Sequence, residues 1–417
     1  MNHFLAKKNI TPKAKGPLKG YTISVKDNIC TKDLETTAGS QILRGYKPLF
    51  DATVVEKIKN SGADILAKTS MDEFGFGSFN TNTTNPPTNP LDESRVTGGS
   101  SGGSASAVKR LNKHISIAES TGGSIANPAS FCGVVGYTPT YGLVSRYGLI
   151  DYANSLDKIG VIASSSTECA LMMKIISGHD PKDNTSIKKQ IDFTKKNSTL
   201  KGTKIGIPKE YLDVDPNIKK SFDQSIKKLE NKGAIIKYIS LPLNKDYSLE
   251  TYYVIAMAEA STNLAKLCGQ RFGKSLDLIE EYNLQYSKVR SKYLGKETQR
   301  RIIIGTYIRQ AGFRNKYYDK ALRVRKILID EYKKQFEDID IIAHPSMPCI
   351  APKFFEVNKL QPIEMYKMDL LTCGVNLAGL PHISIPMELD NMAAGILLTA
   401  NHLDDNKLLN IGEQFEN

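Results

Sequence analysis

Cysteine and histidine are scarce in this chain of 417 residues, and neither residue is grouped. The six cysteines include no C-x-x-C pair, and the six histidines show no ligand spacing. A zinc site and a disulfide framework are therefore not expected, and a reducing compartment fits best. Long apolar runs are lacking as well, since none approaches the roughly 18 residues that a membrane span requires.

The N-terminus lacks the apolar segment of a secretory signal and is rich in lysine instead. No acid occurs before Asp27, and the first twenty residues contain Lys7, Lys8, Lys13, Lys15 and Lys19. This pattern is compatible with import into an organelle and equally with a solvated basic tail. The net charge of +12 favours a polyanionic partner such as RNA, although no RNA-binding signature with interleaved aromatics accompanies it.

Strand-like and helix-like segments alternate through most of the chain. Strands are predicted at 20–25, 63–67, 114–119, 203–208, 233–241, 339–345 and 382–387, and helices at 51–62 and 216–232. The alternation predicts an α/β fold with a mixed, largely parallel sheet covered by helices. Residues 180–202 are predicted to be a polar crossover, and 249–337 a helical insertion before the last strands. We expect one domain over residues 1–417.

Two loops rich in glycine and serine stand out: RVTGGSSGGSASAV at 95–108 (the first loop) and ESTGGSIANPAS at 119–130 (the second loop). A P-loop is excluded because no lysine follows the glycines in register. G-x-S-x-G occurs at 98–102, but a nucleophile elbow must follow a buried strand, and a polar, proline-broken segment precedes this one. S-x-x-K at 106–109 lacks its partner motifs. A flexible linker is also excluded, because apolar segments flank both loops closely.

The second loop is suited to holding an oxyanion. Gly122, Gly123 and Ser124 follow the strand predicted at 114–119, where a turn toward a helix would leave backbone N–H groups free as donors.

A nucleophilic serine also needs a base, and histidine is the common solution. His114, His344 and His382 lie in or beside strand-like runs, however, and are interpreted as structural. A lysine can serve instead when burial lowers its pKa and populates the neutral amine. Lys26 is the candidate because it ends an apolar strand.

Three segments together resemble the amidase signature family: SVKDN at 24–28, TGGSSGGSASA at 97–107 and STGGSIANPASFCGVVGYTPTYGLVSRYGLI at 120–150. Their order and spacing match, with 74 residues from Lys26 to Ser100 and 24 more to Ser124. The likeness extends from PLKGYTISVKDN to NLAGLPHISIPM and so covers most of the chain. It implies the amidase-signature fold and a Ser–cis-Ser–Lys triad, with Ser124 as nucleophile, Ser100 as bridging serine and Lys26 as base.

The same resemblance implies the geometry around the triad. The backbone N–H groups of Thr121, Gly122 and Gly123, with that of the nucleophile, would form the oxyanion hole. The peptide bond between Gly99 and Ser100 would be cis. The neighbouring Ser101 is interpreted as a supporting hydrogen-bonding residue.

Within this family the chain most resembles the subunits that hydrolyse glutamine for the glutamyl-tRNA(Gln) amidotransferases. DNICTKDLETTAGSQIL and SRYGLIDYANSLDKIG carry this closer likeness. Tyr252, Arg301 and Asp369 match glutamine-binding positions, and the last two suit the α-carboxylate and the α-ammonium of glutamine. The implied partners are tRNA(Gln), a B-type subunit, which would use ATP and magnesium within the complex, and a small third subunit. The resemblance implies no cofactor bound by this chain.

Two positions near the triad depart from the family pattern. The family usually has aspartate where this chain has Ser120, and arginine where it has Ala126. The hydrogen bonds that brace the second loop are therefore expected to differ. A stand-alone amidase acting on another small amide and a non-catalytic scaffold remain alternatives.

The ends and the charge of the chain carry two further expectations. The helical region that usually precedes the lysine is nearly absent, so the packing of the small third subunit is expected to differ, and another partner would cover that surface. The positive charge and the lysine-rich start predict a mitochondrial matrix protein, with bacterial or archaeal cytoplasm as the alternative.

Overall fold

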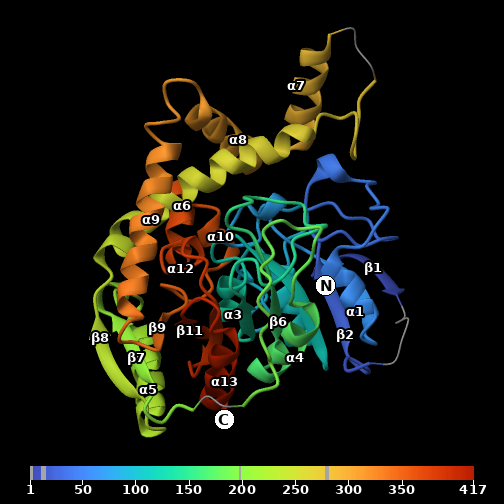
Figure 1. The fold of residues 1–417 in the computed structure, drawn as a ribbon. Coiled ribbons are helices and arrows are strands. Elements are labelled where there is room, and N and C mark those ends of the chain that lie inside the picture. Colours follow the sequence, from blue (N-terminus) through green and yellow to red (C-terminus); the bar gives the residue numbers. More distant parts are fainter. Residues whose placement is uncertain (1–2, 11–15, 197–198, 278–280) are drawn as a thin grey trace.

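A computed structural model describes residues 3–10, 16–196, 199–277 and 281–417. One sheet of eleven strands runs through the molecule in the order β1-β3-β2-β4-β6-β5-β10-β11-β9-β7-β8 (Figure 1). The strands are β1 (Phe4–Ile10), β2 (Thr22–Lys26), β3 (Asp64–Thr69), β4 (His114–Ser120), β5 (Val135–Thr138), β6 (Lys158–Ala163), β7 (Lys204–Pro208), β8 (Ile235–Ile239), β9 (Ile341–Pro345), β10 (His382–Met387) and β11 (Ala394–Ala400). The mixed α/β class predicted from the sequence is confirmed.

The sheet is parallel toward its two ends and antiparallel in its middle. β2 pairs in parallel with β3 and β4, and β7 with β8 and β9. The pairs that run from β4 through β6, β5, β10 and β11 to β9 are antiparallel, as is the outer pair of β1 and β3. The prediction of a largely parallel sheet is therefore wrong. It assumed helical crossovers throughout, whereas β10 and β11 are joined by the short loop 388–393, and hairpin neighbours must be antiparallel.

The N-terminal lysines belong in part to a strand. β1 pairs with β3, with Phe4 opposite Thr69 and Ile10 opposite Ile65. A solvated tail over these residues is therefore a wrong prediction, because an edge strand needs partners on one side only and accepts polar sequence. Lys13 and Lys15 lie outside the described residues.

Helices cover both faces of the sheet because successive strand residues point to opposite faces. On β6, Val161 packs into the core with α1, α4, α5 and α13, whereas Ile162 packs with α2 and α3. The helices are α1 (Thr53–Lys59), α2 (Gly102–Arg110), α3 (Ala126–Cys132), α4 (Ser166–Ile176), α5 (Pro216–Asn231), α6 (Pro242–Asn263), α7 (Tyr282–Tyr293), α8 (Lys296–Arg309), α9 (Tyr318–Gln335), α10 (Phe354–Val357), α11 (Pro362–Tyr366), α12 (Cys373–Leu377) and α13 (Asp405–Glu416).

Helices α6 to α9 form a layer of their own, drawn in yellow to orange in Figure 1. They occupy most of the range 249–337 that was predicted to be helical, although α6 begins earlier, at Pro242, which suits the first turn of a helix. Ile255 and Leu328 of this layer share a core with Phe74 and Tyr152 from the first half of the chain. The layer therefore packs directly onto the loops that follow β3 and precede β6.

All the strands and helices predicted by residue range are found, with each end within about three residues of its predicted place. The sequence did not predict β1, β5, β6 or β11. The crossover at 180–202 contains no helix or strand in its described part, and 197–198 lie outside the description. Within the described ranges, no helix is long and apolar enough to cross a membrane.

Candidate active site

The predicted site forms at the carboxyl ends of two parallel strands. Lys26 is the last residue of β2, and β4 ends at Ser120, directly before the glycines of the second loop. β2 and β4 are neighbours in the sheet, so their carboxyl ends lie at the same edge. Ligand and active sites in open α/β sheets form at this edge. The sheet thereby brings together residues that are 93 positions apart.

Lys26 is completely buried and its ammonium group has three acceptors. Its Nζ donates to Ser100 Oγ at 2.8 Å, to the Glu119 carbonyl oxygen at 2.8 Å and to Glu119 Oε2 at 2.9 Å. The predicted pairing of lysine with bridging serine is therefore present in the geometry. The ion pair with Glu119 was not predicted, and both side chains in it are buried.

The first loop places Ser100 and ties the two loops together. The peptide bond between Gly99 and Ser100 is cis, as the resemblance implied. A Cβ on Gly99 would collide with the Asp72 carboxylate, so only glycine fits at this position. Ser101 donates its hydroxyl to the Glu119 carbonyl at 3.1 Å and its N–H to the Ser124 carbonyl at 3.2 Å. The support that was predicted for Ser101 is thus seen as two contacts.

The two positions that depart from the family pattern, Ser120 and Ala126, lie in and beside the second loop. The Ser120 hydroxyl donates to the Gly122 carbonyl at 2.9 Å, so this serine closes the loop on itself. Ala126 lies in an apolar cluster with Leu241 of the neighbouring segment. The Asn376 amide of α12 donates to the Thr121 carbonyl and fixes the loop from the opposite side.

The geometry leaves donors and a hydroxyl available in this loop. Within the described residues, the N–H groups of Gly122 and Gly123 donate to no protein acceptor. Ser124 retains 8% exposure, whereas Ser100 is completely buried. A hydroxyl that keeps some solvent access beside free N–H groups is an arrangement compatible with oxyanion stabilisation.

Arg301 lies in a box of aromatic rings instead of facing solvent. Its guanidinium carbon is 5.0–5.7 Å from the ring centres of Phe76, Tyr152, Tyr253 and Tyr366. Nε donates to Glu297 at 2.7 Å and a terminal nitrogen donates to the Tyr152 hydroxyl at 2.6 Å. The side chain is 3% exposed, so its charge depends on these partners.

Asp369 and Tyr252 lie against the second loop. The Asp369 carboxylate accepts from the Tyr253 hydroxyl at 2.7 Å, and burial raises the pKa of this carboxyl. A Cβ on Gly123 would stand 3.0 Å from Asp369 Oδ1, and one on Gly122 would stand 2.9 Å from the Tyr252 hydroxyl. The structure therefore places both side chains at the loop that carries Ser124, while the aromatic box joins Arg301 to Asp369 through Tyr253.

Glu119 and the aromatic box were missed from the sequence. An acid at the end of an apolar strand, as the first residue of the second loop, was a usable signal for Glu119. The box could not be anticipated, because Phe76, Tyr152, Tyr253 and Tyr366 come from four separate segments.

Two of the histidines illustrate why this residue type is a poor candidate for the base. His114 contacts the Thr22 and Ser24 hydroxyls, and burial lowers its pKa to about 4. Burial lowers the pKa of His344 to about 4 as well, and its ring packs on Tyr211. Both rings are neutral parts of the core, which supports their structural interpretation.

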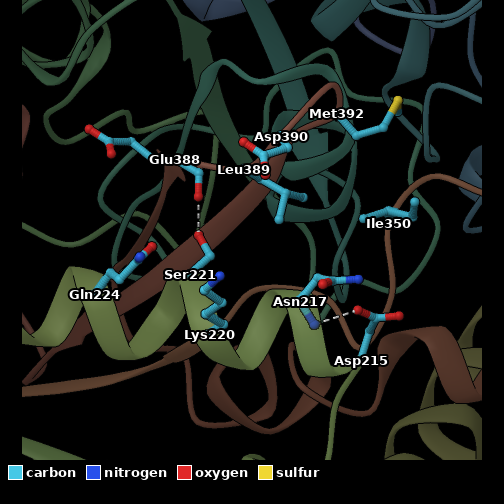
Figure 2. A pocket seen from close by; sticks show the side chains of 10 residues that line it. All are labelled: Asp215, Asn217, Lys220, Ser221, Gln224, Ile350, Glu388, Leu389, Asp390 and Met392. Carbon is cyan, nitrogen blue, oxygen red and sulfur yellow. Dashed lines mark hydrogen bonds between the residues drawn. The ribbon is translucent and has the colours of Figure 1, made fainter.

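Two pockets help to define the surroundings. A pocket of about 590 Å³ lies between α5 and the loop after β10; it is lined by residues such as Asp215, Ser221 and Glu388 and by none of the predicted site residues (Figure 2). A second pocket, of about 360 Å³, lies at the start of α8 and includes Glu297, the ionic partner of Arg301. Within the described ranges, no group of three or more His, Cys, Asp or Glu side chains could hold a metal ion.

The fold and the buried lysine–serine contact define an amidase, and the chain belongs to the amidase family, whose sequence profile matches residues 5–409. It is 44% identical over 405 residues to the glutamyl-tRNA(Gln) amidotransferase A subunit of Methanospirillum hungatei, covering 96% of this chain and 93% of that relative. The identity to the protein of the same name from Acinetobacter baumannii is 44% over 408 residues, covering 96% and 82%. The crystal structure of the corresponding A subunit from Thermotoga maritima matches with a TM-score of 0.84 and 38% identity, covering 98% of this chain and 85% of that one.

Proposed function

We propose that this chain hydrolyses glutamine as the A subunit of a glutamyl-tRNA(Gln) amidotransferase. The observation that carries the proposal is the placement of two sets of residues around one loop. The Lys26–Ser100 contact lies on one side of the second loop, and Asp369 lies against it on another, beside the box that holds Arg301. The 44% identity to two relatives of that name supports the same function.

Catalysis would pass protons along the proposed triad, in which the Lys26–Ser100 contact is the first link. Lys26 takes the proton of the Ser100 hydroxyl, Ser100 takes the proton of Ser124, and the Ser124 oxygen attacks the side-chain amide carbon of glutamine. The negative charge on the carbonyl oxygen is held by N–H groups of Thr121, Gly122 and Gly123. The tetrahedral intermediate collapses, the proton returns to the leaving nitrogen, and ammonia departs. Water then hydrolyses the acyl-enzyme and releases glutamate.

Substrate recognition would use opposite charges at the two ends of the glutamine backbone. Arg301 suits the α-carboxylate, because a guanidinium carries five N–H donors, and two of its nitrogens have the partners Glu297 and Tyr152 described above. Asp369 suits the α-ammonium, and Tyr252 packs beside both the loop and Tyr253.

The partners follow from the same proposal. Ammonia would pass to a B-type subunit, which uses ATP and magnesium to convert Glu-tRNA(Gln) to Gln-tRNA(Gln), and a small third subunit would complete the assembly. No cofactor is assigned to this chain. Location in the mitochondrial matrix is part of the proposal and rests on the net charge of +12 and the lysines near the start.

Co-purification with a tagged chain, followed by a glutaminase assay, tests the function. The expected result is glutamine hydrolysis that requires the partners and rises with ATP and Glu-tRNA(Gln), and that is lost in Ser124→Ala. No hydrolysis in the presence of all these components would contradict the proposal. Rapid hydrolysis of simple amides by the isolated chain, without preference for glutamine, would favour a stand-alone amidase.

A further inference from the structure

Lys26 faces the buried carboxylate of Glu119, and a buried carboxylate charge is stable only beside an opposite charge, so the pairing favours the charged form of the lysine. An ammonium has three hydrogens and no acceptor site, and three oxygens lie within 2.8–2.9 Å of this Nζ. Before Lys26 can take a proton from Ser100, one of its own protons must leave. Among the three acceptors, only Glu119 Oε2 belongs to a group that can bind that proton.

The other oxygen of Glu119 is connected to a second buried acid. The Thr121 hydroxyl lies 2.8 Å from Glu119 Oε1 and 2.8 Å from Asp157 Oδ1. A hydroxyl has one hydrogen and can donate to only one of these oxygens. The remaining contact is a hydrogen bond only when one of the two carboxyl groups carries a proton.

Asp157 is the acid that holds this proton. Burial and the nearby Glu119 charge raise the pKa of Asp157 well above its ordinary value. Its other oxygen accepts from the backbone N–H groups of Tyr152 and Ala153 at 2.9 and 3.0 Å, so the proton lies on the side of Thr121. Asp157 then donates to Thr121, and Thr121 donates to Glu119. The other oxygen of Glu119 faces Lys26 and accepts from the Asn28 amide at 3.0 Å.

We propose that Glu119 is the proton-accepting partner of Lys26, so that Ser124, Ser100, Lys26 and Glu119 form one relay. Lys26 gives a proton to Glu119 Oε2 as it takes the proton of Ser100, and Ser100 takes the proton of Ser124. After the attack, the proton on Glu119 returns through Lys26 and Ser100 to the leaving nitrogen. Glu119 acts through Lys26 and is a positioning residue. The inference rests on the proposed role of Ser124 as nucleophile.

The orientation of Glu119 also bears on the serine that follows it, Ser120. Successive residues of a strand face opposite sides of the sheet, so an acid at 119 and an acid at 120 would point in opposite directions. In this chain the acid points to Lys26, and the residue at 120 is a serine that bonds to its own loop.

One further acid faces the relay. Asp72, in the loop after β3, interacts with the charges of Lys26 and Arg301, and burial raises its pKa to about 6. A pH profile of the site therefore contains contributions from Asp72 and Asp157 as well as from the pair. Only a substitution at Glu119 separates them.

The test is the pH dependence with which a serine-directed fluorophosphonate probe labels Ser124 in the full-length chain, with Ser124→Ala as the blank. In Glu119→Gln, the neutral amide cannot accept a proton, so Lys26 itself must lose one before labelling. The acid limb should move to higher pH, and labelling at pH 6 should fall by about tenfold or more. An unmoved acid limb in folded Glu119→Gln overturns the proposal.

Two variants complete the design. Asp51→Asn removes a carboxylate from another buried lysine, Lys59, at 2.7 Å, and should leave the profile unchanged. Glu119→Asp keeps the charge but withdraws the oxygen by one methylene, so the acid limb should stay and the maximal rate should fall. If Glu119→Gln does not fold, Glu119→Asp decides, and labelling equal to the parent chain at every pH overturns the relay.

Labelling needs neither glutamine nor the partner proteins. The experiments can therefore contradict the proposed function without contradicting the relay, and the reverse. A shifted limb in a chain whose assembled complex never hydrolyses glutamine supports the relay and contradicts the proposed function. An unmoved limb in a chain whose complex hydrolyses glutamine contradicts the relay alone.

Discussion

At the scale of single residues, the proposed proton relay would act as a unit. In that proposal Lys26 reaches Ser124 only through Ser100, so the contributions of Lys26 and Ser100 should not add. We expect Lys26→Ala and Ser100→Ala each to lower kcat for glutamine by about three orders of magnitude. The double variant should be no slower than the slower single variant. Steady-state kinetics of the assembled complex measures this.

The control for that cycle is a serine of the same first loop that is outside the relay. Ser106 donates to the Thr88 carbonyl at 3.2 Å, away from Lys26, so Ser106→Ala should retain kcat. If the fold-losses in kcat of the two single variants multiply in the double variant, Lys26 and Ser100 act independently.

Asp369 carries a prediction on pH. Because burial raises the pKa of this carboxyl, it takes up a proton at higher pH than an ordinary aspartate. The charged form that attracts the α-ammonium is present above that pKa and lost as the pH falls through it. The KM for glutamine should therefore rise toward acid pH in the parent chain. Asp369→Asn should have a high KM at every pH.

A substrate without the amine separates this effect from the relay. Glutaramate keeps the amide and the carboxylate but has no ammonium, so its KM should not rise toward acid pH. A KM for glutamine that is flat across the pH range would contradict the assignment of Asp369.

At the scale of elements, one buried acid fixes the helix that carries Arg301. Glu73 accepts from the Gly295 N–H at 2.8 Å and from the hydroxyls of Thr298 and Ser40, so it anchors the first turn of α8 to the loop after β3. Hydrogen bonds to a charged acceptor are worth about 1.5–3 kcal/mol each. Glu73→Gln should lower the free energy of unfolding by about 1–3 kcal/mol and raise the KM for glutamine.

An acid in the first turn of another helix is the matched control. Glu56 of α1 is exposed and pairs with Lys182 only at 3.8 Å, so Glu56→Gln should change stability by less than about 0.5 kcal/mol. Denaturant titration and glutamine kinetics measure both effects. An unchanged KM in a destabilised Glu73→Gln would show that α8 keeps Arg301 in place without this anchor.

The individual strands and loops also show how much of the fold could be predicted from the sequence. β2 and β4 were predictable as short apolar runs, and the two loops were predictable as glycine and serine clusters, the second of which directly follows β4. β6 and β11 are short, strongly apolar runs, whose periodicity alone does not distinguish a strand from a buried helix, and β1 mixes lysines into a strand. Contacts such as Lys26–Glu119 depend on register across a sheet, which one sequence does not specify.

For the site, the roles predicted for the residues came from the family resemblance, and the neighbours of those residues became known only from the structure. Lys26 and Ser100 meet as expected, yet the acid beside them is one residue outside the matched motif. Arg301, taken as an isolated helical residue, gives no sign of burial, because its partners are rings from distant segments. The partners of a buried charged side chain depend on the tertiary structure and cannot be read from the residues next to it in the sequence.

At the scale of the whole molecule, the two halves of the chain are interleaved. β10, from the C-terminal part, lies between β5 and β11, and one apolar core extends from Leu18 to Phe415. The helical layer shares its own core with Phe74 and Tyr152 of the first half. No cut through the sequence separates two independent cores among the described residues, which is why we expect a single cooperative unit.

That expectation is testable, because chains of this length often unfold in steps. We predict one transition, with calorimetric and van't Hoff enthalpies that agree and with coincident circular dichroism and tyrosine fluorescence. Asp405→Asn replaces the carboxylate that accepts from the Tyr137 hydroxyl at 2.6 Å with a neutral amide, and Arg325→Lys weakens contacts between α9 and the Ser155 carbonyl at 3.0 Å. Both should shift the same transition to lower temperature. Two transitions, with Arg325→Lys moving only the earlier one, would mean that the helical layer unfolds as a separate domain.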